Sequence, residues 1–183
     1  YGKSNGDIDG FILKLNKDNG NYKAGTHWGT DVYDQIYFID LDPDNNVYFT
    51  GQTEGLVSRT SNTYGQDNAP QFIGKLDNNL KKLEFITTFG TPFRFSANLS
   101  PSAFMVDDCY NIYFSGWGSF VGVGNIGTTI DLETTPDAHQ LTTDGDDFYL
   151  LALNRDANAL QYASFFGGNQ SADHVDGGTS RFD

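Results

Sequence analysis

The stretch Phe72-Ile-Gly-Lys-Leu76-Asp77 decides the fold, because it recurs twice elsewhere in the chain of 183 residues. The other copies are Phe11-Ile-Leu-Lys-Leu15-Asn16, 61 residues earlier, and Tyr149-Leu-Leu-Ala-Leu153-Asn154, 77 residues later. An aromatic residue followed by glycine stands at the same distance after every copy, in Trp28-Gly29, Phe89-Gly90 and Phe166-Gly167. Two anchors with identical offsets indicate an internal repeat.

A third anchor places two further strands in each repeat unit. Asn46-Val-Tyr-Phe-Thr-Gly51 matches Asn111-Ile-Tyr-Phe-Ser-Gly116, and an aspartate, Asp42 or Asp107, stands four residues before each asparagine. Pro and Asx residues between Asp42 and Asn46 are typical of a tight turn. One unit therefore predicts four short strands, at 35–41, 47–51, 71–76 and 82–89. The third strand is apolar on both faces, so we expect a sheet on each side of it, as around a propeller blade.

The predicted fold class is all-β: a β-propeller of four-stranded antiparallel blades, present as an incomplete ring of about two and a half blades with ten strands. The smallest ordinary propeller has about sixteen strands. We therefore expect the remainder of the same polypeptide, or another protein chain, to pack against the open blade flanks. One propeller segment, 1–183, has these predicted parts: 7–30, the second half of a blade; 31–90, a complete blade with an insertion at 53–69; 91–168, a complete blade with an insertion at 117–146; and 169–183, the start of the next unit or a linker to a following domain.

The repeated strands, the aromatic-Gly pairs and the segment Thr134-Thr135-Pro136-Asp137-Ala138-His139-Gln140 together resemble the bacterial SBBP β-propeller repeat. The resemblance covers residues 7–168 and implies an architecture rather than an activity. The second copy departs from the first by four extra residues between Gly90 and Gly116, and by Ser115 where the first copy has threonine.

The last residues, 173–183, are similar to segments of large surface proteins of gliding Bacteroidetes, which are exported by type IX secretion. This similarity implies a secreted protein or one on the outer-membrane cell surface, with a connection to gliding motility.

Charge and composition exclude several classes of partner. The chain has 24 acidic and 11 basic residues, a net charge of −13, and no basic cluster larger than Lys81-Lys82. Such a surface repels phosphate backbones and anionic lipid, so we expect neither nucleic-acid binding nor membrane insertion.

No apolar run is long enough to span a membrane, and the first residues lack a signal peptide, so the sequence predicts either a mature product or an excised piece. Cys109 is the single cysteine and is expected to be a buried, inert side chain.

The residues show little sign of metal or catalytic chemistry. Asp42, Asp44 and Asn46 have the spacing of the first calcium ligands of an EF-hand, but Val47 and Thr53 replace its glycine and glutamate. We expect a turn without a cofactor, and calcium is the alternative. The three histidines stand in unrelated segments, and the sequence Gly-x-Gly-x-x-Gly at 122–127 follows a loop rather than opening a helix. His174 with Asp176 is interpreted as a hydrogen-bonded turn.

Both long insertions leave their blades at the same end, so they predict a face of long loops on a rigid scaffold. Within these loops Trp117, Phe120 and Tyr64 are the candidate ligand-binding residues, because they could stack on a sugar or anchor a protein partner. The alternative is that they pack the loops. The predicted function is a non-catalytic scaffold or adhesion module that meets other proteins, surface glycan or secretion machinery. The alternatives are a carbohydrate-binding module and, third, a polysaccharide lyase or glycosidase.

Overall fold

A computed structural model describes residues 6–92, 96–118, 127–169 and 173. These residues contain no helix, and they form ten strands in three antiparallel sheets of two, four and four strands. The strands are β1 (Gly10–Leu15), β2 (Tyr22–Trp28), β3 (Asp34–Leu41), β4 (Val47–Thr53), β5 (Gln71–Leu76), β6 (Leu83–Phe89), β7 (Ser100–Val106), β8 (Ile112–Trp117), β9 (Phe148–Leu153) and β10 (Leu160–Phe166). The all-β class, the strand count and the division into two, four and four strands are as predicted.

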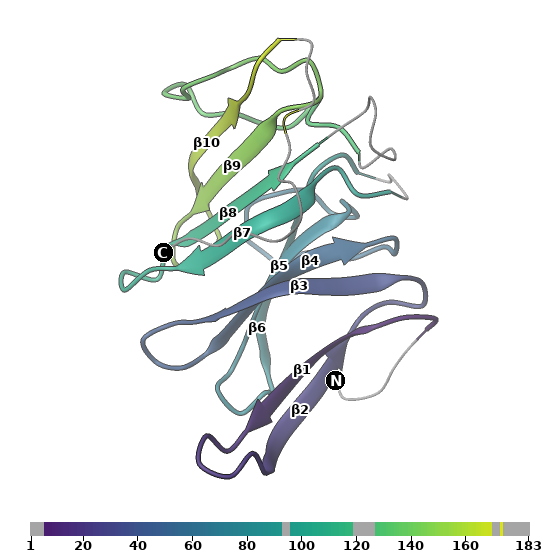
Figure 1. The fold of residues 1–183 in the computed structure, drawn as a ribbon, viewed down its shortest axis with the longest axis vertical. Helices are drawn as coiled ribbons and strands as arrows, with labels where there is room; N and C mark the ends of the chain where they lie inside the picture. The colour runs from purple at the N-terminus through teal and green to yellow at the C-terminus, as the bar shows by residue number, and fades with distance from the viewer. Residues whose placement is uncertain (1–5, 93–95, 119–126, 170–172, 174–183) are drawn as a thin grey trace.

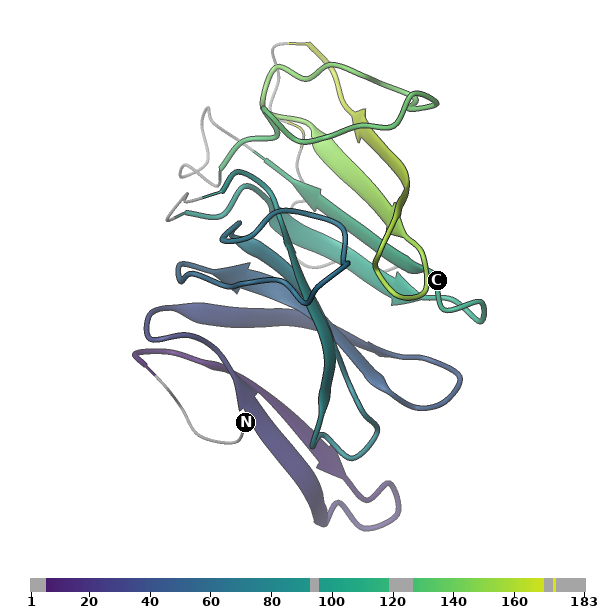
Figure 2. The same cartoon turned by 180° about the vertical axis from the view of Figure 1, so that it is seen from behind.

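The three sheets follow one another along the molecule, and each pairs its strands in chain order (Figure 1). Seen from behind, the β1–β2 sheet again lies at one end and the β7–β10 sheet at the other (Figure 2). The first strands of the two larger sheets meet, and the backbone N–H of Val106 in β7 donates to Asp40 Oδ2 in β3 at 2.7 Å. The described residues do not form a closed ring.

Side-chain alternation along β5 explains why the sheets stack. Phe72 and Leu76 are buried toward the β1–β2 sheet, where the ring of Phe72 lies 3.9 Å from that of Trp28. Ile73, between them in sequence, belongs to the second apolar cluster, which joins the β3–β6 sheet to the β7–β10 sheet. Because successive side chains of a strand point to opposite faces, β5 contributes to the apolar clusters on both sides of its sheet.

Asx side chains hold the short hairpin turns. Asp42 Oδ1 accepts from the backbone N–H of Asp44 and Asn46, and Asp107 Oδ1 accepts from Cys109 and Asn111 in the equivalent turn. Asp77 and Asn154, which follow β5 and β9, accept backbone N–H groups in the same way. These short turns lie at one end of the sheets, opposite the long connections (Figure 1). The sequence motif that ends the repeated strand is therefore a turn-forming device.

Candidate functional site: the long-loop face

The two long insertions follow β4 and β8, at the predicted end of the sheets, but they do not simply project from it. Each runs back along the outer edge of its own sheet. Thr60 donates its backbone N–H to the carbonyl of Ile86 in β6, and the Ile86 N–H donates to Thr60 Oγ1 at 3.0 Å. Thr135 makes the same two bonds with Ala163 in β10. The loops thus satisfy backbone groups that an edge strand would leave unpaired.

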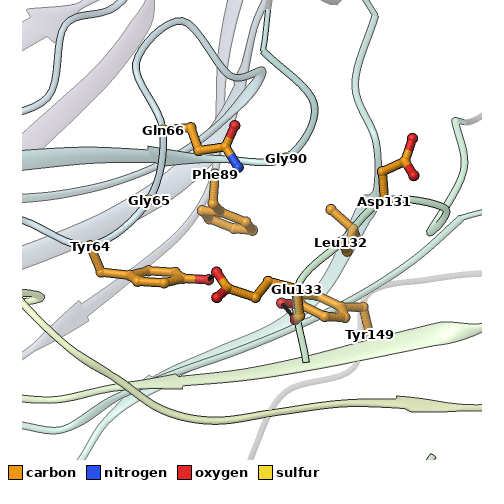
Figure 3. A pocket seen from close by; sticks show the side chains of 9 residues that line it. All are labelled: Tyr64, Gly65, Gln66, Phe89, Gly90, Asp131, Leu132, Glu133 and Tyr149. Atoms are coloured by element: carbon orange, nitrogen blue, oxygen red, sulfur yellow. Dashed lines mark hydrogen bonds between the residues drawn. The ribbon is translucent and has the colours of Figure 1, made fainter. Parts of the chain in front are cut away.

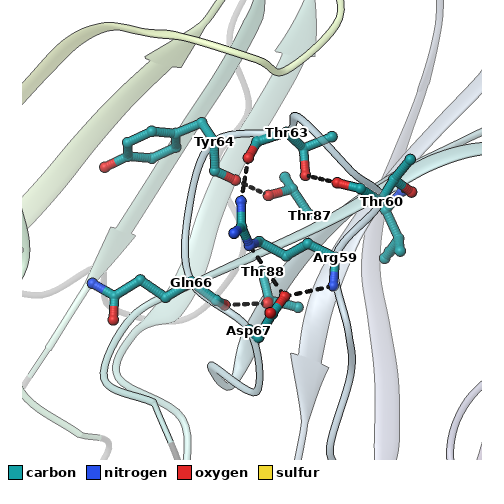
Figure 4. Close-up of polar contacts among 9 residues, drawn as sticks. Arg59, Thr60, Thr63, Tyr64, Gln66, Asp67, Thr87 and Thr88 are labelled. Atoms are coloured by element: carbon teal, nitrogen blue, oxygen red, sulfur yellow. Dashed lines mark hydrogen bonds and ion pairs between the residues drawn. The ribbon is translucent and has the colours of Figure 1, made fainter.

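Arg59 braces the first of these loops (Figure 4). Its guanidinium forms an ion pair with Asp67 at 3.2 Å and donates to the carbonyl of Thr63. Thr87 and Thr88 of β6 also donate their hydroxyls to loop carbonyls, those of Tyr64 and Gln66. The segment from Arg59 to Asp67 is therefore fixed against the sheet from two sides.

Tyr64 joins the two long loops to each other (Figure 3). Its hydroxyl donates to Glu133 Oε2 at 2.7 Å, and the hydroxyl of Tyr149 donates to the Glu133 carbonyl at 2.6 Å. Burial, with the hydrogen bond to Glu133, raises the pKa of Tyr64, and burial beside Glu133 raises the pKa of Tyr149. Both phenols therefore stay protonated as donors. The cavity between the loops is about 20 Å³, room for roughly one water molecule.

Of the three candidate aromatic residues, the structure describes Trp117 and Tyr64, and their surroundings differ. Trp117 is only 8% exposed at the end of β8, and this burial favours the packing interpretation of its role. Tyr64 is partly buried and its hydroxyl is engaged with Glu133. Phe120 lies outside the described residues.

Four other apolar side chains are exposed at this end of the sheets, and of these only Phe166 belongs to a sequence motif, the aromatic-Gly pair of the repeat. They come from the first loop, the second loop and the end of β10: Leu56, Ile130, Leu141 and Phe166, with exposures between 46% and 60%. For the other three, Leu56, Ile130 and Leu141, the available signal was a large apolar residue inside a loop. Exposed apolar side chains on a rigid scaffold commonly form protein–protein contacts.

Asp42, Asp44 and Asn46 do not converge on a common point. Asp42 is buried and bonds to Lys75 Nζ at 3.1 Å, Asn46 donates its amide to Asp42, and Asp44 accepts from the hydroxyl of Tyr110. Burial alone would raise the pKa of Asp42, but the hydrogen bonds from Asn46 and the charge of Lys75 outweigh it and lower that pKa. These bonds support the turn-forming interpretation. Over the described ranges, no group of three or more His, Cys, Asp or Glu side chains is arranged to hold a metal ion.

Cys109 takes the place of Asp44 in the second turn and is exposed, so the expectation of a buried cysteine was wrong. The reason is that the middle of this turn points to solvent in both copies. His139 lies beside Phe166, with ring centroids 5.8 Å apart, and His174 lies outside the described residues.

Two comparisons with known proteins found no match. No protein-family model matches the chain, and no curated protein matches it. The resemblance to the SBBP repeat thus rests on the chain's own residues. None of the described segments is a helix that could cross a membrane.

Proposed function

We propose that this chain is part of a β-propeller, about two and a half blades of a longer or shared ring, that serves as a non-catalytic scaffold or adhesion module of a secreted or cell-surface bacterial protein. The observation that carries the proposal is the exposure of Phe11. Phe11 is 68% exposed, whereas Phe72, at the same repeat position one sheet later, is fully buried. The β1–β2 sheet covers Phe72 in the β3–β6 sheet. Among the described residues, no sheet covers Phe11 on the corresponding face of the β1–β2 sheet.

Two other apolar side chains on the outward face of β1 are also exposed. Leu13 and Leu15 are each 49% exposed on the same face as Phe11, and Leu76, the counterpart of Leu15, is buried. Such a continuous apolar face is rare on a free surface and is normal between stacked sheets. A further sheet, from the same polypeptide or another chain, is the natural covering.

The contact between β3 and β7 supports a ring over a flat stack. In a propeller the first strand of each blade lies nearest the axis, and here the first strands of two sheets bond directly to each other through Asp40. The outer strands β6 and β10 are instead covered by their own loops. Inner and outer edges therefore differ as blades of a ring require.

The binding role is assigned to the long-loop face, where the loops are braced by Arg59 and by the Tyr64–Glu133 bond while apolar side chains stay exposed. Rigid loops lose little conformational entropy when a partner binds. Protein partners suit this face better than sugars do, because three of its four exposed apolar side chains, Leu56, Ile130 and Leu141, are aliphatic, whereas sugar stacking uses aromatic rings, of which Phe166 is exposed and Trp117 is buried.

The test is an adhesion assay with beads that carry the chain, on a panel of extracellular proteins and on a glycan array. A loop-face variant, Ile130→Asn with Leu141→Asn, should lose at least about tenfold in binding with an unchanged melting temperature. Leu41→Asn is the matched control, because Leu41 is 51% exposed at the opposite end of the sheets. Equal binding by both variants, or no binding to any protein surface, would contradict the adhesion role. Glycan binding would favour the carbohydrate module, and polysaccharide cleavage that ends on one Asp or Glu substitution would show an enzyme.

A further inference from the structure

The glycines of the three aromatic-Gly pairs share one environment. At Gly29, Gly90 and Gly167 the space that a Cβ would take is occupied by a side-chain oxygen, from Asp9, Asn98 and Asp147 respectively. Each glycine lies at the junction where the last strand of one sheet leads to the next unit. Glycine is required there because any larger residue would displace that oxygen.

Two of these junctions are acidic. At the last, Asp173 Oδ2 lies 2.5 Å from the same Cβ position as the Asp147 oxygen, so two carboxylates meet over Gly167. At the first, the carboxylates of Asp9 and Asp34 meet over Gly29 in the same way. The backbone pattern repeats too, because Asp34 and Asp173 each accept the N–H of the residue that follows the glycine, Thr30 and Gly168.

The buried oxygens of these pairs are not all satisfied. Asp34 and Asp147 are both fully buried, and Oδ1 of each has no hydrogen-bond partner. Asp147 Oδ2 accepts from Gln140 Nε2 at 3.2 Å, while its Oδ1 is the atom that faces Gly167 and Asp173. A buried carboxylate oxygen without a donor is costly unless a cation or a proton compensates it.

The middle junction shows what a satisfied arrangement looks like. There Pro70 takes the place of Asp9 and Asp147, and Asn98 takes the place of Asp34 and Asp173. Asn98 is also fully buried, yet its Oδ1 accepts from the N–H of Thr91 and its Nδ2 donates to Thr91 Oγ1 and to the Thr128 carbonyl. The neutral junction has no orphan oxygen and no negative charge to balance.

Within the ranges that the structure describes, no ion pair to a basic side chain involves Asp34, Asp147 or Asp173. The ion pairs of the described residues join Arg59 to Asp67, Lys75 to Asp42 and Lys82 to Glu84, and none involves Asp34 or Asp147. A cation that binds oxygen ligands would compensate the unpartnered Oδ1 of Asp147 and that of Asp34.

We propose that the Asp147–Asp173 junction binds a divalent cation, Ca²⁺ by its chemistry, and that the Asp9–Asp34 junction is a second site of the same design. Ca²⁺ takes six to eight oxygen ligands in flexible geometry, so two carboxylates can be completed by carbonyl oxygens and water. Two acidic ligands place the dissociation constant on the order of 0.1–1 mM, the range of extracellular calcium modules. The sites are distinct from the Asp42 turn, whose carboxylate is already bonded to Lys75.

The test is calorimetric titration of the intact chain with CaCl₂, together with terbium luminescence. Trp28 adjoins Gly29, and Trp117 precedes Gly118, whose N–H donates to the Asp147 carbonyl, so each junction has an indole to sensitise bound Tb³⁺. We expect two Ca²⁺ per chain. Calcium at about 100 times the dissociation constant should raise the melting temperature by roughly 5–10 °C for each site.

Variants that keep the side-chain shape separate the two sites. Asp147→Asn should lose one of the two bound Ca²⁺ ions and the Tb³⁺ signal that Trp117 sensitises. Asp34→Asn should lose the other Ca²⁺ ion. The double variant should bind neither. Asp131→Asn, an exposed acid in the second loop, is the matched control and should keep both equivalents. Without calcium, Asp147→Asn should melt higher than the wild type, since it removes a buried charge.

Three results would overturn the proposal. One is the absence of heat and of a thermal shift in the wild type at 10 times the proposed dissociation constant, which would mean that the carboxylates share a proton. Another is calcium binding that survives in the double variant. The last is equal loss of calcium in Asp131→Asn, which would mean diffuse binding to an acidic surface. Circular dichroism of each variant confirms that it is folded, and none of these results bears on the loop-face adhesion assay.

Discussion

Removing Asp42 should cost far more stability than removing Asp107, although the two residues hold equivalent turns. Both carboxylates accept two backbone N–H groups and one asparagine amide. The difference is the fourth partner. Asp42 bonds to the ammonium of Lys75, whereas Asp107 bonds to the hydroxyl of Tyr113 at 3.0 Å, and Ala152 takes the place of Lys75 in that sheet.

The magnitudes follow from burial. The side chain of Asp42 is fully buried and that of Lys75 is 14% exposed, so Asp42→Ala leaves a buried ammonium without its partner, at a cost of about 3–5 kcal/mol. Asp107 is partly exposed, so water can hydrogen-bond the groups that lose their partner in Asp107→Ala. This substitution should therefore lower the free energy of unfolding by only about 1–2 kcal/mol. The gap of about 2–3 kcal/mol is the effect of the unpaired Lys75.

The assay is urea unfolding followed by tryptophan fluorescence. With a slope m of about 2 kcal/mol per molar, the midpoint should fall by about 1.5–2.5 M in Asp42→Ala and by about 0.5–1 M in Asp107→Ala. Adding Lys75→Met to Asp42→Ala should recover part of the loss, because it removes the unpaired charge. Equal midpoints for the two alanine variants, or no recovery in the double variant, would refute the reasoning.

Two further predictions concern the edge loops and acid. Thr60→Val and Thr135→Val each remove the hydroxyl that accepts an edge-strand N–H, so each should cost about 1 kcal/mol and speed hydrogen exchange at that amide in β6 or β10; unchanged exchange would argue against edge covering. Because the pKa of Asp42 and of Asp107 is lowered in the fold, the stability they give is present above their unfolded pKa of about 3.9. That stability should be lost as the pH falls through the folded values, and a urea midpoint constant from pH 5 to 2 would contradict this.

The strands could be predicted because the repeat marks them twice, by apolar alternation and by turn chemistry. Asp42 and Asp107 fix the start of the second strand in each unit, and observed β4 and β8 begin one residue after the asparagine that ends each turn. The predicted third strand, 71–76, matches β5 at both ends. Local sequence is sufficient here because these turns are held by neighbouring residues.

The long loops could not be predicted in the same way. The path of the first loop depends on the unpaired edge of β6, which is a property of the assembled sheet, and Thr60 shows no local sign of meeting Ile86. Trp117 looked like a binding residue because it stands at the border of a loop, but it is the last residue of β8 and is buried. Contacts between distant segments decide both cases.

The acidic junctions were missed for a related reason. Asp147 stands in the sequence among the other acids of its loop, Asp144 and Asp146, and only folding places it over Gly167 beside Asp173. The sequence shows Gly167 as part of the repeat, but it does not show which side chains surround this glycine in the fold. A glycine fixed at one repeat position, with acids near it in the folded chain, is the signal that could have located the pair.

The central claim is that another sheet covers the β1–β2 flank and continues a ring. The most direct measurement is an experimental structure of the protein as isolated from its natural source, at a resolution that places the side chain of Phe11. The account predicts that the exposed fraction of Phe11 falls from 68% to nearly zero, as for Phe72, with β3 and β7 nearest a common axis. Sheets in an open row, with Phe11 still facing solvent, would contradict it.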